Sequence, residues 1–255
     1  MEMSKMWDQV SDNVTLVLVC LFTFVVIAVL SKLFEKAFVK QRRAQGAVYI
    51  AYVAMFSAIG GVLMLLEIPL FFAPSFYKMD LSELPVLLCS FYLGPVAGAT
   101  AEFLKVFLKI LFKGTSTAFV GDYANFVVGC SFILPASAIY HIHKTKRNAV
   151  LGMIVGTLVM SVFGSAFNAL YLIPKFAQLF GMPIDVIVGM GTKINSRIVS
   201  VPTLVMYAVV PFNLLKGAVD GFLTYFLYKR LETVFFKGSA TWKEPTQYMP
   251  NKEKE

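Results

Sequence analysis

The amino-acid sequence predicts an all-α integral membrane protein in which one extra transmembrane helix precedes a bundle of six. Three observations favour this fold class. Hydrophobic residues make up 58% of the 255 residues and charged residues only 15%, with a mean hydropathy of +0.71, far from the values of a soluble domain. Apolar runs recur along the whole chain, and most are long enough to cross a bilayer as helices. The charges lie at the ends of these runs rather than in one basic field, so the net charge of +8 does not indicate a nucleic-acid-binding protein.

Seven spans are expected, in the order 14–31, 48–66, 82–93, 95–112, 123–143, 149–172 and 203–228. The short third span meets the fourth at Gly94-Pro95, a helix break without a charged linker, which predicts a tight helical hairpin. The first span contains no charged residue, and a basic stretch separates it from the others. We therefore expect an extra helix with its basic linker at 1–46, a six-helix unit at 47–235 and a polar cytoplasmic tail at 236–255.

Basic segments set the expected orientation. Lysines and arginines follow the first span at 32–43, the fifth span at 144–147 and the last span at 229–237. The positive-inside rule places these segments in the cytoplasm. The N-terminus is then outside, the C-terminus is cytoplasmic, and the connections 67–81, 113–122 and 173–202 face outward. We expect a multi-pass protein of the cell membrane.

Several kinds of chemistry find little support in the sequence. The three cysteines, Cys20, Cys89 and Cys130, lie inside apolar runs without metal or redox spacing. No phosphate-binding Gly-x4-Gly-Lys-Ser/Thr motif occurs, so the chain cannot hydrolyse ATP by the P-loop route. Gly121-Asp122 is similar to part of an intramembrane aspartyl protease motif, but Phe119 stands where that motif needs glycine. We expect Asp122 to cap the fifth helix, and we predict neither catalytic residues nor a metal site.

The first outer connection is too apolar for a solvated linker. Between residues 67 and 85 it holds three prolines and four aromatic residues. Such a segment either caps a pocket or forms an aromatic belt at the headgroup level. Asp80 and Ser82 also suit the N-cap of the next helix, and Glu83 is favourable in its first turn.

The last span carries the least expected residues. Asn213, Lys216 and Asp220 lie at i, i+3 and i+7, on one stripe of the helix. A lysine at mid-bilayer costs roughly 2.5–3.5 kcal/mol, so it faces a cavity, a partner or a substrate. The kink expected at Pro211 favours a polar pocket, whereas an internal Lys216–Asp220 pair would reduce the burial cost without a ligand. Asn168, on the sixth span, supplies a second neutral polar group for the pocket or for interhelical hydrogen bonding.

Other polar residues have structural explanations. On the fourth span Glu102, Lys105 and Lys109 repeat the i, i+3, i+7 spacing, and a Glu102–Lys105 pair would be self-neutralising. His141 and His143 lie at the cytoplasmic end of the fifth span. We interpret them as helix-end residues near the negative end of the helix dipole, not as metal ligands.

Small residues mark one face of the second span. Ala47, Ala51, Ala54 and Ala58 form small-xxx-small steps, which allow another helix to approach closely. The same pattern also packs helices within one chain, so the sequence leaves the partner open.

Residues 47–235 resemble the substrate-binding S component of an energy-coupling factor (ECF) vitamin transporter, most closely the riboflavin-specific type. The resemblance rests on Asp80-Leu-Ser-Glu83-Leu-Pro85 with the aromatic stretch before it and Tyr92-Leu-Gly-Pro95 after it. Gly121-Asp-Tyr-Ala-Asn125-Phe and Asn213-Leu-Leu-Lys216-Gly complete it. The first helix departs from the six-span pattern of the family, and Asp220 has no role assigned by it.

The resemblance implies a vitamin pocket that opens outward beneath the first outer connection. Asn168 and Asn213 would bind the imide edge of a flavin or its ribityl hydroxyls, and Lys216 would donate to an oxygen. Phe76 and Tyr77 would cover the ring. The implied substrate-binding set is Phe76, Tyr77, Lys78, Asp80, Glu83, Asn125, Asn168, Asn213 and Lys216.

The resemblance also implies partners. The face formed by Ala47, Ala51, Ala54 and Ala58 would dock the membrane coupling subunit, and two cytosolic ATPases would drive delivery of the vitamin. Free riboflavin is favoured over its phosphate, because a phosphate prefers an arginine cluster and the outer connections hold only Arg197. Riboflavin would be cargo and not a cofactor. An S component for another vitamin is the alternative, and an intramembrane enzyme is the weaker one.

Overall fold

A computed structural model describes residues 2–39, 44–74, 77–115, 117 and 119–235, with side chains described from residue 18 to residue 228. Four elements of the prediction lie wholly or partly outside the described residues: Phe76, the middle of the basic linker, the basic residue at 237 and the polar tail 236–255. The regular secondary structure of the described chain is helical apart from one short hairpin, in which β1 (Ile68–Pro69) pairs antiparallel with β2 (Lys78–Met79).

The helices follow the expected order of spans. They are α1 (Glu2–Phe38), α2 (Gly46–Leu65), α3 (Glu83–Leu93), α4 (Pro95–Lys113), α5 (Val120–Ile142), α6 (Lys146–Phe167), α7 (Ile173–Leu179), α8 (Ile184–Thr192), α9 (Val201–Leu204) and α10 (Val210–Phe235), with π-helical turns η1 (Asn168–Leu172) and η2 (Val205–Val209).

Five helical segments of the described chain are long and apolar enough to cross a membrane: Leu18–Phe38, Gly46–Leu65, Val120–Ile142, Lys146–Leu179 and Val201–Tyr228. The other two expected spans form α3, which has only 11 residues, and α4, which carries four charged residues along its 19. The first helix is longer than predicted. The sixth and last spans each continue as one rod through a π turn.

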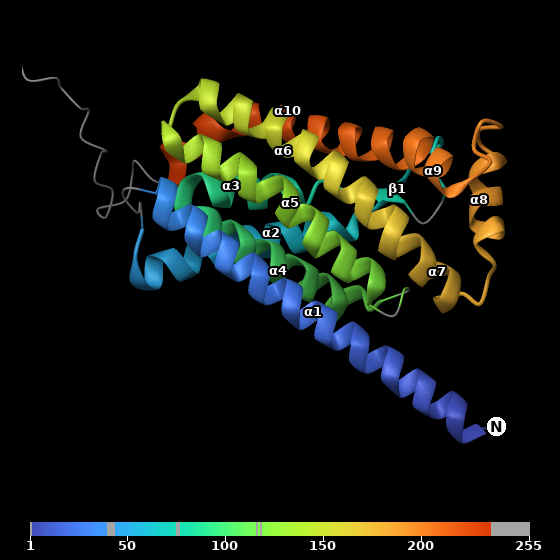
Figure 1. The fold of residues 1–255 in the computed structure, drawn as a ribbon. Helices are drawn as coiled ribbons and strands as arrows, with labels where there is room; N and C mark the ends of the chain where they lie inside the picture. Colours follow the sequence, from blue (N-terminus) through green and yellow to red (C-terminus); the bar gives the residue numbers. More distant parts are fainter. Residues whose placement is uncertain (1, 40–43, 75–76, 116, 118, 236–255) are drawn as a thin grey trace, which may run out of the picture.

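The bundle has two distinct ends (Figure 1). The short helices α7, α8 and α9 gather with β1 at one end, and the α5–α6 turn lies at the other. Helix α6 packs against α5 and α10, α2 packs against α4, and α1 runs along α4 and α5. The end that holds α7–α9 and β1 is the one the sequence predicts to face outward.

Small residues allow α5 and α6 to pack closely. A Cβ added at Gly152 would lie 2.5 Å from the Ala136 carbonyl oxygen, and one at Gly156 would lie 2.6 Å from that of Phe132. Real Cβ atoms do not approach this closely, so a larger residue at Gly152 or Gly156 would force the two helices apart.

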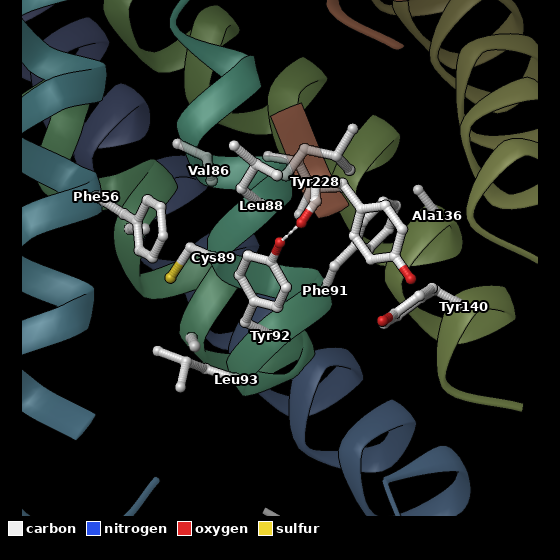
Figure 2. Packing of buried hydrophobic residues seen from close by; sticks show 14 of the residues in the cluster. Phe56, Val86, Leu88, Cys89, Phe91, Tyr92, Leu93, Ala136, Tyr140 and Tyr228 are labelled. Atoms are coloured by element: carbon white, nitrogen blue, oxygen red, sulfur yellow. Dashed lines mark hydrogen bonds between the residues drawn. The ribbon is translucent and has the colours of Figure 1, made fainter. Parts of the chain in front are cut away.

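The main apolar core surrounds α3 (Figure 2). The rings of Phe91 and Tyr140 stack with their centroids 4.6 Å apart, and the Tyr92 hydroxyl donates to the Tyr228 carbonyl oxygen of α10. Cys89 is fully buried in this cluster. Helix α3 is therefore covered on all sides although it is too short to span a bilayer.

The Gly94-Pro95 hairpin forms as predicted, and α1 secures it. Gly94 has φ 115°, a conformation that favours glycine, and Pro95 begins α4. The Glu35 carboxylate of α1 accepts from the Val96 amide at 3.3 Å, so α1 caps α4. Near the other end of the bundle, the hydroxyls of Thr23 and Tyr123 lie 2.9 Å apart and join α1 to α5.

Of the capping predictions, the one for Asp122 is wrong and the one for Ser82 is correct in position but not in hydrogen bonding. Asp122 lies inside the first turn of α5 and pairs with Lys109, with 2.6 Å between Nζ and Oδ1, because the helix begins earlier, after Phe119. Ser82 occupies the N-cap position of α3, but its hydroxyl donates to Glu83 at 2.9 Å instead of accepting from the helix. The cap on this turn is Asp80, whose carboxylate accepts from the Ser82 amide at 2.9 Å.

Candidate functional site

A cavity of about 120 Å³ lies at the end of the bundle that carries the short helices. Four segments far apart in the sequence supply its walls: the outer connection after α2 together with the start of α3, the first half of α5, the rod α6–η1–α7, and the first half of α10. Its lining includes seven of the residues predicted for the substrate: Tyr77, Lys78, Glu83, Asn125, Asn168, Asn213 and Lys216.

Two π turns stand beside the cavity, one in each of its long rods. Asn168 begins η1, where its amide donates to the Gly164 carbonyl oxygen at 2.7 Å. On the other rod, η2 directly precedes α10, in which Pro211 lacks the amide hydrogen that a regular helix needs. Single π turns of this kind are frequent at functional sites.

The described residues of the connection between α2 and α3, 66–74 and 77–82, form a lid over the cavity. Tyr77 points inward: it is buried, its ring centroid lies 5.6 Å from that of Phe212, and its hydroxyl donates to Asn168 Oδ1 at 2.7 Å. Burial raises the pKa of the Tyr77 phenol, so the hydroxyl stays a neutral donor. Phe71 points outward and is 91% exposed. The inward position of Tyr77 agrees with the predicted cap over a pocket, and an aromatic belt at the headgroup level stays a prediction.

An ionic clasp holds the lid to the bundle at its outer edge. Glu67 accepts from Lys78 at 3.0 Å and from Lys113, at the end of α4, at 2.8 Å. Partial burial alone would raise the pKa of the Glu67 carboxyl, but the hydrogen bonds and charges of Lys113 and Lys78 outweigh burial and lower the pKa below its ordinary value. The clasp is therefore charged at neutral pH.

A buried ionic network lies beneath the lid. Lys216 Nζ is 3.3 Å from Asp80 Oδ2 and 3.2 Å from Glu83 Oε1. Lys105 Nζ is 3.1 Å from Glu83 Oε2 and 2.9 Å from Glu102 Oε1. The self-neutralising Glu102–Lys105 pair is thus present. Lys105 also contacts the lid, because it donates to the Ser82 hydroxyl at 2.8 Å.

The predicted alternative of an internal Lys216–Asp220 pair is wrong. The lysine reaches across to the lid and α3, because two carboxylates converge on it there. Asp220 is fully buried, and its two oxygens make no hydrogen bond or ion pair with any residue that the structure describes.

Two amides at the cavity lack partners. Asn125 Oδ1 and Asn213 Nδ2 are buried and make no hydrogen bond with the described part of the chain. A buried polar group without a partner costs about 1–3 kcal/mol, so the site is suited to a ligand that offers an acceptor to Asn213 and a donor to Asn125.

Sequence reasoning missed part of the site. Glu83 belongs to the predicted substrate-binding set, but the sequence does not predict that it joins Lys105 to Lys216. Met160 and Phe176 line the cavity although nothing distinguishes them from other apolar residues. Among the described residues no cluster of histidine, cysteine or acidic groups could hold a metal ion, and His141 Nε2 lies 3.0 Å from the Ser90 carbonyl oxygen.

The alanine face of α2 points away from the bundle. Ala47, Ala51, Ala54 and Ala58 are all exposed, while Val53, Phe56 and Gly60 on the opposite side are buried. The small residues therefore do not pack this helix against its own described chain.

Comparisons with known proteins agree on one family. Residues 48–228 match the family model described as "ECF transporter, substrate-specific component". The chain is 34% identical over 179 residues to the riboflavin transporter RibU of Staphylococcus aureus, covering 70% of this chain and 87% of that protein. It is 29% identical over 168 residues to the riboflavin transporter FmnP of Bacillus subtilis, covering 66% and 83%. A solved structure of the S component of a bacterial ECF transporter superposes with a TM-score of 0.58 at 32% identity, covering 73% of this chain and 96% of that one.

Proposed function

This chain belongs to the substrate-specific components of ECF transporters, which are non-enzymatic transport subunits, and from that premise we propose that its substrate is riboflavin. The vitamin binds in the cavity beneath the lid, on the side that the basic segments predict to face outward. Relatives named riboflavin transporters, at 34% and 29% identity, support this choice of substrate.

One observation carries the proposal: the pair of unsatisfied amides at Asn125 and Asn213. The imide edge of a flavin alternates carbonyl, N–H and carbonyl groups. Asn213 Nδ2 donates to a carbonyl, and Asn125 Oδ1 accepts from the N–H. Lys216 then supplies a charged donor to a second flavin oxygen, at the floor of the same cavity.

The size of the cavity implies that the lid moves. Pockets for cofactor-sized ligands usually measure about 300–1,000 Å³, whereas the cavity measures about 120 Å³. Tyr77 lines this cavity and is bonded to Asn168 on its opposite wall. Riboflavin displaces the Tyr77 hydroxyl from Asn168, takes over that bond, and packs its ring against Tyr77.

Membership of the family implies an ECF module as the partner. We propose that the exposed alanine face of α2 docks the membrane coupling subunit, because four small side chains in one stripe let a helix approach closely. Two cytosolic ATPases then drive delivery of the vitamin to the cytoplasm.

Identification of the bound molecule tests the substrate. The full chain is purified from a host supplied with riboflavin and other vitamins, and the extracted ligand is identified by mass spectrometry and its absorption spectrum. We expect a yellow protein that releases riboflavin, and ligand-free protein that quenches riboflavin fluorescence at a one-to-one ratio. Release of another vitamin, with no quenching of riboflavin, would show that the chain serves a different substrate.

A further inference from the structure

A second cavity, of about 530 Å³, opens on the opposite half of the bundle, between α6 and α10. Gly217 and Gly221 line it on α10, where a Cβ added at Gly217 would lie 2.5 Å from Thr157 Oγ1 and one at Gly221 would lie 3.5 Å from Met153 Cβ, so the two helices are close together along the groove. Its walls are apolar and exposed: Ile154 and Leu158 on α6 and Phe222 on α10 are 53%, 54% and 64% exposed. This α6–α10 groove shares none of its described lining residues with the substrate cavity.

The length of the groove matches one leaflet of a bilayer. On α6 it runs from Val150 to Leu158, nine residues whose eight helical steps rise about 12 Å. Half of a hydrocarbon core is about 15 Å thick. Both helices belong to segments long and apolar enough to cross the membrane, so the groove faces acyl chains along its whole length.

Two basic residues lie at the mouth of the groove. Lys146 and Arg147 begin α6, are exposed, and make no ion pair with the described residues. They precede Val150 by four and three positions, which places them on the same face of the helix. The first turn of α6 also contributes the positive end of the helix dipole and contains no acidic residue.

We propose that the α6–α10 groove binds one anionic phospholipid, such as phosphatidylglycerol, as a specific lipid site. One acyl chain lies over Gly217 and Gly221 between Ile154 and Phe222. The phosphate lies at Lys146 and Arg147, where each basic side chain near a membrane surface contributes about 1 kcal/mol, or about fivefold in affinity, toward an anionic headgroup. This proposal does not depend on the identity of the vitamin.

Fluorescence quenching by brominated lipids tests the site in the full chain. Phe222→Trp places an indole in the groove, with Trp7 and Trp242 replaced by phenylalanine. The variant is reconstituted with trace brominated phosphatidylglycerol or brominated phosphatidylcholine. We expect phosphatidylglycerol to quench at a mole fraction about 30-fold lower, and Lys146→Gln with Arg147→Gln to remove that preference. The matched control, Lys193→Gln with Arg197→Gln, removes the same amount of positive charge between α8 and α9. It should keep the preference for phosphatidylglycerol.

A second position and a second measurement make the test specific. Val162→Trp, an exposed position on α6 outside the groove, should show no headgroup preference. Ala218→Trp, which fills the groove, should remove the phosphatidylglycerol that native mass spectrometry detects on the parent protein. Equal quenching by both lipids at position 222 would overturn the proposal. So would protection of that position by a co-purified protein chain, which would make the groove a docking surface.

Discussion

Lys216 illustrates how a charged residue is accommodated within an apolar helix. An isolated ammonium at this depth is costly, but Asp80 and Glu83 both lie within 3.3 Å of its Nζ atom. Removal of one partner from a buried pair is more damaging than the pair is stabilising. A ligand that accepts a hydrogen bond from Lys216 therefore joins an ion-pair network in which the lysine is already bonded to Asp80 and Glu83.

Substitution of this lysine tests its role in binding. A hydrogen bond to a charged group contributes about 1.5–3 kcal/mol, so Lys216→Met should weaken riboflavin binding roughly ten- to a hundredfold in a fluorescence titration. The double change Lys216→Met with Asp220→Leu should not restore affinity, because the lysine pairs with the lid and α3 instead of Asp220. As a control, Lys109→Met breaks a buried pair outside the cavity and should lower stability while sparing affinity. Full recovery in the double variant would count against a ligand role.

Tyr77 tests whether the lid and the vitamin share a partner. Its hydroxyl occupies Asn168 Oδ1, and a neutral hydrogen bond contributes about 0.5–1.5 kcal/mol. If riboflavin takes over that bond, Tyr77→Phe removes the competitor, and affinity should rise by about two- to tenfold. Asn168→Ala should weaken binding instead. A loss of affinity in Tyr77→Phe would mean that the hydroxyl itself contacts the vitamin.

At the scale of elements, the sequence predicts helix breaks and helix faces, because both depend on residues that are close together in the chain. Gly94-Pro95 ends one helix and starts the next, and the alanine spacing defines a face of α2 that is indeed exposed. Cap positions were less predictable. Asp122 and Ser82 suited caps by residue type, but a buried cation attracts each of them away, and that cation, Lys109 or Lys105, lies on another helix.

The alanine face is tested by adding bulk to it. Ala51→Trp with Ala54→Trp should block assembly with the coupling subunit and abolish uptake, because close approach of helices needs small residues. Riboflavin binding by the isolated chain should stay within about twofold, since neither residue faces the cavity. Ile59→Trp is the control: it is 44% exposed on the same helix but lies roughly 110° away from the stripe. Unchanged transport in the double variant would show that the face contacts only lipid.

The extra helix α1 should stabilise the bundle without contributing to binding. It contacts α4 and α5 through Glu35 and Thr23, and none of its residues from Leu18 onward, where side chains are described, lines the substrate cavity. Deletion of residues 1–45 should leave the dissociation constant for riboflavin within about threefold, while the lost N-cap at α4 costs about 0.5–2 kcal/mol and lowers the melting temperature. A folded truncation that no longer binds would show that α1 shapes the cavity.

At the scale of the whole molecule, the buried ions connect the lid and three helices. Lys105 of α4 reaches Glu83 of α3, which reaches Lys216 of α10, which reaches Asp80 of the lid. The sequence places every one of these residues in or beside an apolar run, and it predicts the pair within one helix, Glu102 and Lys105. The contacts between helices could not be predicted in this way, because helical spacing specifies which residues share a face but not which faces meet.

Lys105 is the residue on which this network depends most. It is fully buried and pairs with both Glu83 and Glu102, so Lys105→Met leaves two carboxylates short of a partner. Loss of one member of a buried ion pair costs about 3–5 kcal/mol, which for a domain of this size lowers the melting temperature by roughly 6–20 °C.

Lys105→Met with Glu102→Gln should be less destabilised than Lys105→Met alone, because one of the two unpaired charges is gone. Lys113→Met breaks a pair at the partly exposed Glu67 and should cost no more than about 1 kcal/mol. Thermal unfolding in detergent distinguishes these variants, and equal melting temperatures for Lys105→Met and Lys113→Met would show that the network does not hold the bundle together.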